Sequence, residues 1–63
     1  MPLVQVTMLT GRTVDQKRKL AQRITDAMVE EASARREAVV VTFYETPKES
    51  YASGGVLMAD KGK

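Results

Sequence analysis

Pro2 is the residue through which this sequence offers a general base. An initiator methionine is normally removed when a small residue such as proline follows it, so the mature chain would begin with the secondary amine of Pro2. An α-amino group has a reference pKa of ~7.7–8.0, and both burial and a nearby cation lower such a value toward neutrality. The amine therefore predicts proton-transfer chemistry. The alternative is that Pro2 only opens an edge strand, where its missing N–H costs nothing.

Arg12 is the second candidate, because it follows the first predicted strand and directly precedes a predicted helix start. A guanidinium binds a carboxylate through paired hydrogen bonds, and the free N–H groups of a helix N-terminus add to such an anion site. The sequence therefore predicts a carboxylate-binding residue at the end of that strand. The alternative is a solvated surface arginine.

The composition excludes most other catalytic chemistry. The chain has 63 residues with no His and no Cys, which excludes a histidine base, a Ser-His-Asp triad, a thiol nucleophile, a disulfide scaffold and a Cys/His zinc site. A net charge of +2 is too small to indicate nucleic acid. No apolar run approaches the ~18 residues of a membrane span, and no signal-peptide pattern is present. We expect one domain over residues 1–63, in the cytoplasm.

Two runs of the sequence are predicted to be strands. In Leu3–Leu9 apolar residues alternate with mixed ones, and one face carries Val4, Val6 and Met8, which should point to the core. Val39–Glu45 contains three consecutive valines, which suits a strand covered on both faces, as parallel strands usually are.

Thr13–Ser33 is predicted to form one helix between these strands. Thr13 and Gln16 match a capping box, and Gly11 supplies a break with φ > 0 before it. The stripe expected to pack on the sheet consists of Leu20, Ile24, Ala27 and Met28, with Lys17 and Ala21 at its edge. The residues expected on the solvated side include the basic run Lys17, Arg18 and Lys19.

Strand, helix and strand predict a single βαβ unit of the α/β class, with parallel strands and a right-handed crossover. A short C-terminal strand or hairpin is predicted after the second strand, from the Thr46–Ser50 loop, the flexible Gly54–Gly55 pair and the apolar Val56–Met58. The last residues, Asp60–Lys63, are predicted to form a frayed tail. Glu45, at the end of the second strand, is a candidate to hold a lysine or a backbone group. One helix cannot cover both faces of the sheet, so we expect a partner subunit as the cover and an oligomer as the working unit.

Several stretches, taken together, resemble one known family. The run from Pro2 to Lys17, PLVQVTMLTGRTVDQK, resembles the opening of the 4-oxalocrotonate tautomerase family, with its amino-terminal proline, alternating strand, Gly-Arg pair and capped helix. The valine-rich strand ending in Glu45 and the stretch Lys48–Gly55, with an aromatic four residues before its second Gly, are also similar to that family. The resemblance covers almost the whole chain and includes its length.

The resemblance implies a cofactor-independent keto-enol tautomerase, an isomerase that moves a proton within small unsaturated 2-oxo or 2-hydroxy acids. Pro2 would be its catalytic base, Arg12 would bind the substrate carboxylate and stabilise developing negative charge, and Tyr51 would form an apolar wall that lowers the pKa of the amine. No metal or organic cofactor is implied. Members of the family are hexamers built as trimers of dimers, so the resemblance implies a homo-hexamer, with a hetero-oligomer as the alternative.

Val40 departs from the family pattern. It stands where the best-known members carry a second arginine, and valine can neither bind a carboxylate nor polarise a carbonyl. A monoacid substrate, a weak promiscuous activity and a second type of subunit that supplies the arginine are each compatible with this departure. Arg35 or Arg36, at the approach to the second strand, are further candidates for the missing cation, and a solvated loop pair is the alternative.

Two other functional classes stay open. The resemblance also implies a second enzymatic possibility, because related family members add water to unsaturated acids or dehalogenate them, but this chain offers no clear set of polar groups to activate water. A non-catalytic alternative is a small oligomeric binding protein, such as a dimer that inserts an N-terminal β-ribbon into DNA. Such dimers need a second helix where Val39–Tyr44 favours a strand, so we expect neither nucleic acid nor membrane as a partner.

Overall fold

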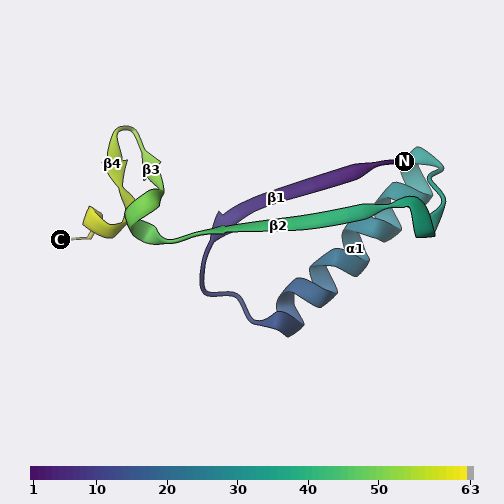
Figure 1. Cartoon of the computed structure of the whole chain (residues 1–63), viewed down its shortest axis with the longest axis horizontal. Coiled ribbons are helices and arrows are strands. Elements are labelled where there is room, and N and C mark those ends of the chain that lie inside the picture. The colour runs from purple at the N-terminus through teal and green to yellow at the C-terminus, as the bar shows by residue number, and fades with distance from the viewer. Residues whose placement is uncertain (63) are drawn as a thin grey trace.

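A βαβ unit followed by a small hairpin makes up the fold of residues 1–62, the part of the chain that the computed structural model describes. Strands β1 (Leu3–Leu9) and β2 (Val40–Thr46) are parallel neighbours, in register over their whole length. Helix α1 (Val14–Ala32) connects them and runs back along the pair (Figure 1). The predicted α/β fold is confirmed; Lys63, part of the expected tail, lies outside the described residues.

Both ends of α1 are closed by local hydrogen bonds, and those at its N-terminal end form the capping box that the sequence predicts. Thr13 Oγ1 accepts from the Gln16 N–H at 3.1 Å, and the Thr13 N–H donates to Gln16 Oε1 at 2.9 Å, which completes the capping box. At the other end Ser33 takes a left-handed conformation, with φ 55°. Gly11 precedes the helix at φ 129°, a region that favours glycine. The helix with its two caps therefore spans Thr13–Ser33, as predicted.

Strand β2 begins and ends one residue later than predicted. The Val39 N–H donates to the Arg36 carbonyl at 3.2 Å, so Val39 ends the short helix η1 (Arg36–Ala38) instead of starting the strand. Thr46 belongs to the strand because its carbonyl accepts from the Thr10 N–H at 3.1 Å, which extends the pairing with β1.

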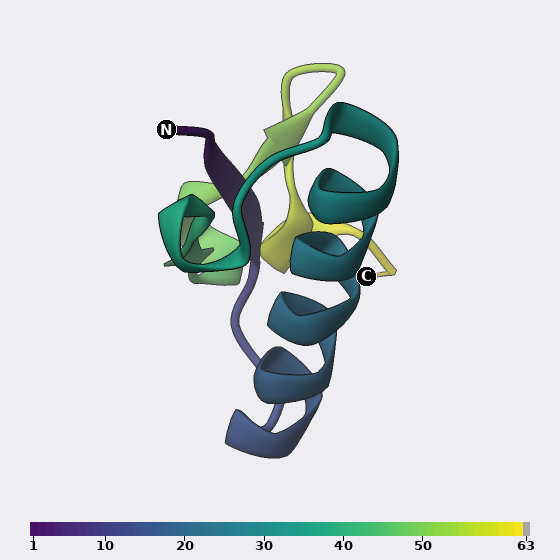
Figure 2. The same cartoon turned by 90° about the vertical axis from the view of Figure 1, so that its right-hand side faces the viewer.

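The face of α1 that lies on the sheet is rotated from the predicted one, although Ile24 and Met28 of the predicted stripe remain on it. The half-buried helix residues include Lys17, Ala21, Ile24, Thr25 and Met28. Leu20 and Ala27 stay exposed, so their prediction as packing residues is wrong for the single chain, as is that of Lys17 as a solvated one. Two strands ~4.8 Å apart make a sheet narrower than a helix of ~10 Å diameter, so they cover only part of the predicted stripe. Figure 2 shows α1 on one side of the strands.

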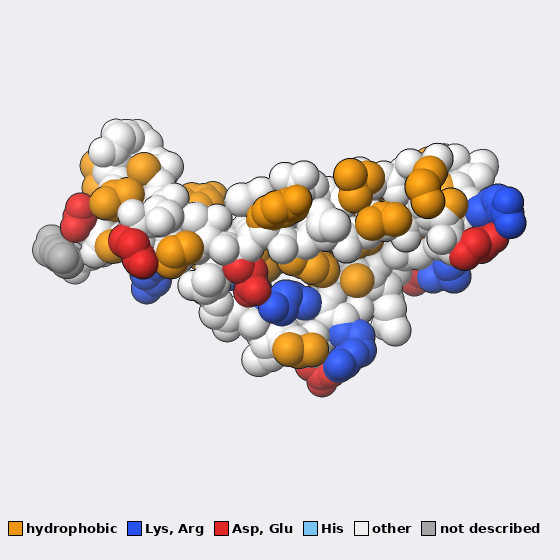
Figure 3. Space-filling model, viewed as in Figure 1, with side chains coloured by type: hydrophobic (Ala, Val, Ile, Leu, Met, Phe, Trp, Pro, Cys, Tyr) orange, Lys and Arg blue, Asp and Glu red, His pale blue; other side chains and the backbone are white. Residues whose placement is uncertain are grey.

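The two faces of the sheet differ in what covers them. The face toward α1 carries the half-buried residues Val4, Val6, Met8, Val41 and Phe43. The opposite face, called here the uncovered face, consists of Leu3, Gln5, Thr7, Val40, Thr42 and Tyr44. Its Leu3 is 64% exposed and its Tyr44 is 54% exposed. Hydrophobic side chains are visible along the strand pair and on the hairpin (Figure 3), and no described residue is fully buried.

The C-terminal segment projects beyond the end of β2, away from the N-terminus (Figure 1). Its strands β3 (Ala52–Ser53) and β4 (Val56–Leu57) pair antiparallel, and the turn between them is Gly54-Gly55, both at positive φ. Two short helices flank this hairpin, η2 (Lys48–Ser50) and η3 (Met58–Asp60). The predicted hairpin is confirmed, but Met58, expected in its strand, and Asp60, expected in a frayed tail, both belong to η3. Among the described residues, no helix is both long and apolar enough to cross a membrane.

Candidate active site

Pro2 is attached to the sheet through its carbonyl. The Val40 N–H donates to the Pro2 carbonyl at 3.0 Å, just before the register of β1 and β2 begins. Pro2 is half-buried, whereas Met1 is 95% exposed. Removal of Met1 would therefore keep the bond that holds Pro2 and would free its secondary amine at the end of the strand pair.

Arg12 lies at the opposite end of the sheet. It belongs to the loop between β1 and α1, and the seven residues of β1, at ~3.3 Å each, separate the two strand ends by about 23 Å. Figure 1 shows the N-terminus at one end of the strand pair and this loop at the other. The single chain thus does not bring Pro2 and Arg12 together.

The Arg12 guanidinium is exposed, and within residues 1–62 it forms no ion pair or hydrogen bond. Three other arginines are paired with carboxylates: Arg18 with Asp15, Arg35 with Glu37 and Arg36 with Asp26. Arg23, on α1, resembles Arg12 in lacking such a partner in the described part of the chain. Because no carboxylate within residues 1–62 pairs with it, Arg12 has its donors available for an anion.

Val40 is the backbone neighbour of Pro2 and lies on the uncovered face, 38% exposed. It therefore presents an apolar side chain at the end of the sheet that carries the candidate base. Arg35 and Arg36, the alternative cations of this region, both have guanidinium groups already paired with carboxylates of the same chain. In the single chain, Arg35 and Arg36 are therefore engaged with carboxylates of η1 and α1.

Tyr51 follows η2, beyond the end of β2. Its carbonyl accepts from the Met58 N–H at 2.7 Å, and its side chain is 37% exposed. Because β2 runs parallel to β1, this position is at the end of the sheet far from Pro2 (Figure 1). The apolar wall expected beside the proline is therefore not formed by Tyr51 of the same chain.

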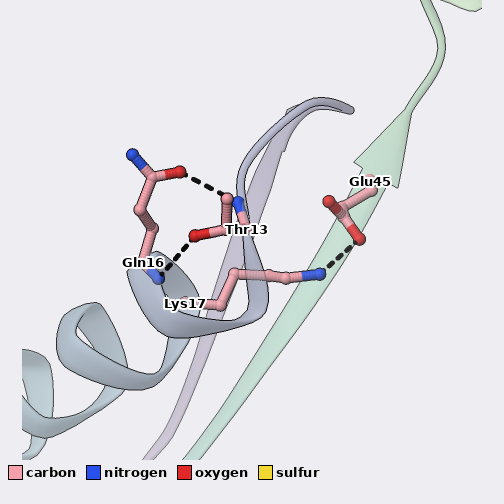
Figure 4. Close-up of polar contacts among 4 residues, drawn as sticks. All are labelled: Thr13, Gln16, Lys17 and Glu45. Atoms are coloured by element: carbon pink, nitrogen blue, oxygen red, sulfur yellow. Dashed lines mark hydrogen bonds and ion pairs between the residues drawn. The ribbon is translucent and has the colours of Figure 1, made fainter.

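An ion pair near Arg12 joins α1 to β2. Lys17 Nζ donates to Glu45 Oε2 at 2.8 Å, and the two side chains are only 25% and 30% exposed (Figure 4). The expectation that Glu45 holds a lysine or a backbone group is confirmed, with Lys17 as the partner. The sequence signal for Lys17 is its place four residues before Ala21, on the half-buried stripe of the helix.

The candidate residues are divided between two ends of the molecule. Pro2 and Val40 lie at one end, and Arg12 and Tyr51 lie at the other. Residues 1–62 form no pocket on their own, and they include no group of three His, Cys, Asp or Glu side chains that could hold a metal ion. A site that used both Pro2 and Arg12 would need at least two copies of the chain.

Known proteins match this chain over nearly its whole length. Residues 2–61 match the family described as tautomerase enzyme. A probable tautomerase from Bacillus cereus is 46% identical over 61 residues, which are 97% of this chain and 100% of that protein. The 2-hydroxymuconate tautomerase of Bacillus subtilis is 43% identical over 60 residues, 95% of this chain and 97% of that protein.

A solved structure agrees with the sequence matches. A heterohexamer 4-oxalocrotonate tautomerase from Chloroflexus aurantiacus J-10-fl has a TM-score of 0.91 to this chain at 31% identity, covering 97% of this chain and 98% of that one. Sequence and backbone thus lead to the same family over the same residues. The chain belongs to the tautomerase family, among the homologues of 4-oxalocrotonate tautomerase, and is an enzyme of the isomerase class.

Proposed function

We propose that this enzyme moves a proton within small unsaturated 2-oxo or 2-hydroxy acids, with the amine of Pro2 as the general base after Met1 is removed. The 2-hydroxymuconate tautomerase from Bacillus subtilis, 43% identical, supports this class of substrate. The sequence match begins at residue 2, so the resemblance includes the proline itself. The proposal also includes the cytoplasmic setting expected from the sequence.

The observation that carries the proposal is the way Pro2 is held. Its carbonyl is bonded to the Val40 N–H at 3.0 Å, while the residue on its nitrogen side, Met1, is 95% exposed and open to an aminopeptidase. The base can therefore be created by one cleavage without loosening the strand that positions it. A chain with no His obtains a group that titrates near neutrality in this way.

The chemistry needs only the amine, a cation and the conjugated acid. The Pro2 nitrogen takes the proton of the substrate 2-hydroxyl group. The C2–O bond then becomes a carbonyl, and the double bonds shift along the carbon chain of the substrate. The proline ammonium then returns the same proton to a carbon, which leaves the enzyme unchanged. Arg12 binds the carboxylate and stabilises the negative charge that spreads over the conjugated system.

Arg12 must come from a second copy, because it lies about 23 Å along the strand from Pro2 of its own chain. The same holds for Tyr51, which we propose as the apolar wall beside the proline of a neighbour. We propose a homo-hexamer built as a trimer of dimers, in which the uncovered face is buried. A hetero-oligomer is the second arrangement, and the heterohexamer from Chloroflexus aurantiacus J-10-fl is a relative that supports it.

Val40 restricts the class of acid that we propose as the substrate. It lies beside Pro2 and is apolar, and Arg35 and Arg36, the two arginines of its own chain that directly precede β2, are both paired with carboxylates. The end of the substrate that reaches Val40 should therefore carry no charge. We propose a monocarboxylate, bound by Arg12 at its one acidic end.

Two measurements test this function. Intact mass spectrometry should show a chain that lacks Met1. The purified protein should ketonise a 2-hydroxy-2,4-dienoate monoacid, and this reaction can be monitored as a decrease in the ultraviolet absorbance of the dienol. Pro2→Ala should then lower kcat by about 10²-fold or more, because positioned general acid–base catalysis contributes 10²–10⁴. Unchanged turnover in Pro2→Ala, at the same state of assembly, would remove Pro2 from the mechanism.

A further inference from the structure

We infer that the ion pair between Lys17 and Glu45 positions Arg12 for substrate binding, without touching the substrate itself. This inference rests on the proposed function, in which Arg12 binds the carboxylate. It adds two residues to which the function above gives no role. The evidence is a closed ring of bonds around the Arg12 loop.

The ring starts and ends at Thr10. From Thr10 the chain passes covalently through Gly11 and Arg12 to Thr13, whose carbonyl accepts from the Lys17 N–H at 3.1 Å. The Lys17 side chain then reaches Glu45 Oε2 at 2.8 Å (Figure 4). Glu45 is followed by Thr46, whose carbonyl accepts from the Thr10 N–H at 3.1 Å, and this bond closes the ring.

The loop inside this ring needs external restraint. Gly11 has the widest conformational freedom of any residue type, and it directly precedes Arg12 at φ 129°. The capping box fixes Thr13 relative to α1, and the Thr10 bond fixes the other side of the loop relative to β2. The Lys17–Glu45 bond joins these two fixed parts to each other. It therefore sets how far the helix start lies from the strand end, and so where Arg12 projects.

The burial of the pair separates it from an ordinary surface salt bridge. Its side chains are 25% and 30% exposed, whereas those of the neighbouring Arg18 and Asp15 are 60% and 73% exposed. Exposed pairs in water contribute little, because solvent screens them and both side chains lose freedom. The Arg18–Asp15 pair is on the same helix turn but connects nothing to the sheet, so it is a matched control.

The neutralisation of Lys17 has a second consequence for Arg12. Because Glu45 pairs with Lys17, the ammonium group does not compete with the Arg12 guanidinium for the substrate carboxylate. The substrate then meets one oriented, planar donor group instead of two cations at different positions. Loss of either partner should thus weaken both the placement and the selectivity of the anion site.

The first test uses single substitutions and steady-state kinetics on the assembled enzyme with the monoacid dienol. Lys17→Met and Glu45→Gln should each lower kcat/KM about tenfold, mainly through KM, since misplacement of a binding group by ~1 Å can cost up to 10²-fold. Arg18→Met should change neither parameter. The charge-swapped double variant K17E/E45K retains one cation and one anion in the same pair and should recover most of the loss.

The second test asks whether the effect acts through Arg12. In an Arg12→Ala background, Lys17→Met and Glu45→Gln should cause no further loss, because the residue they position is gone. An equal loss with and without Arg12, or no loss in either single variant, overturns the inference and leaves the proposed function standing. If Arg12→Ala itself has wild-type KM and kcat, the proposed role of Arg12 fails and this inference fails with it.

Discussion

The exposed surface of the single chain predicts that folding and assembly are one process. A compact 7.0 kDa monomer is expected to have about 4,000 Å² of accessible surface, whereas this chain has 4840 Å² and no fully buried residue in its described part. Tyr44 is the large aromatic of the uncovered face and is 54% exposed. We therefore expect Tyr44→Ala to weaken assembly, and the loss of association free energy follows from this exposed area.

An aromatic side chain buries roughly 200 Å² when it is fully covered, so covering the exposed 54% of Tyr44 removes about 110 Å² from water. At ~25 cal/mol per Å² this contributes about 3 kcal/mol per copy, close to a hundredfold in a dissociation constant. Sedimentation equilibrium should show this weaker assembly. The protein concentration at which the oligomer is half dissociated should be roughly hundredfold higher for Tyr44→Ala than for the native chain. The unfolding midpoint of both proteins should fall on dilution, because an oligomer that forms only from folded chains is stabilised by mass action.

A matched control is available on the helix. Val14 is 65% exposed but lies at the start of α1, away from the uncovered face, so Val14→Ala should leave the dissociation constant nearly unchanged. The reasoning is refuted if the native chain stays a folded monomer at high dilution with a midpoint independent of concentration. It is also refuted if Tyr44→Ala and Val14→Ala weaken assembly equally.

Further predictions concern the site and the helix that supports it. Arg12→Ala should raise KM about 10- to 150-fold, because hydrogen bonds to a charged group are worth about 1.5–3 kcal/mol. Arg23→Ala removes the other arginine that has no ion pair within residues 1–62, and it should leave KM unchanged in the same ketonisation assay. Val40→Arg should raise kcat/KM for a 2-hydroxydienedioate diacid at least tenfold relative to kcat/KM for the monoacid, because it places a cation beside Pro2. If the ratio of these two kcat/KM values stays unchanged, the role given to Val40 is contradicted. Thr13→Ala should lower the free energy of unfolding by about 1 kcal/mol per chain through loss of the cap, measured by urea titration at fixed protein concentration.

Local sequence patterns were sufficient for β1 and for the N-terminal end of α1. The bounds of β1 and the capping box of α1 agree with the sequence because alternation and the Thr13–Gln16 pair act over a few neighbouring residues. The start of β2 was placed one residue early, since the valine run is uniform and contains no signal for the bond from Val39 to Arg36.

The face of α1 that packs on the sheet could not be derived from periodicity alone. An apolar stripe with Leu20 and Ala27 is a correct description of α1, but the width of the sheet decides which part of that stripe is covered. With two strands the covered part is centred nearer Lys17 and Ala21. The ion pair of Lys17 with Glu45 depends on this rotation and on the parallel register, because the two residues are far apart in the chain.

The sequence by itself determined the chemistry that is available: a proline at position 2 that becomes an amine once Met1 is removed, a guanidinium at Arg12, an apolar residue at Val40, and no histidine or cysteine to replace them. Only the tertiary structure decided where these groups lie. A straight seven-residue strand keeps its two ends about 23 Å apart, and a parallel crossover leads Tyr51 to the same end as Arg12. Residue types are properties of single positions, whereas the place of each residue depends on strand length, on strand direction and on which face of the sheet the helix covers.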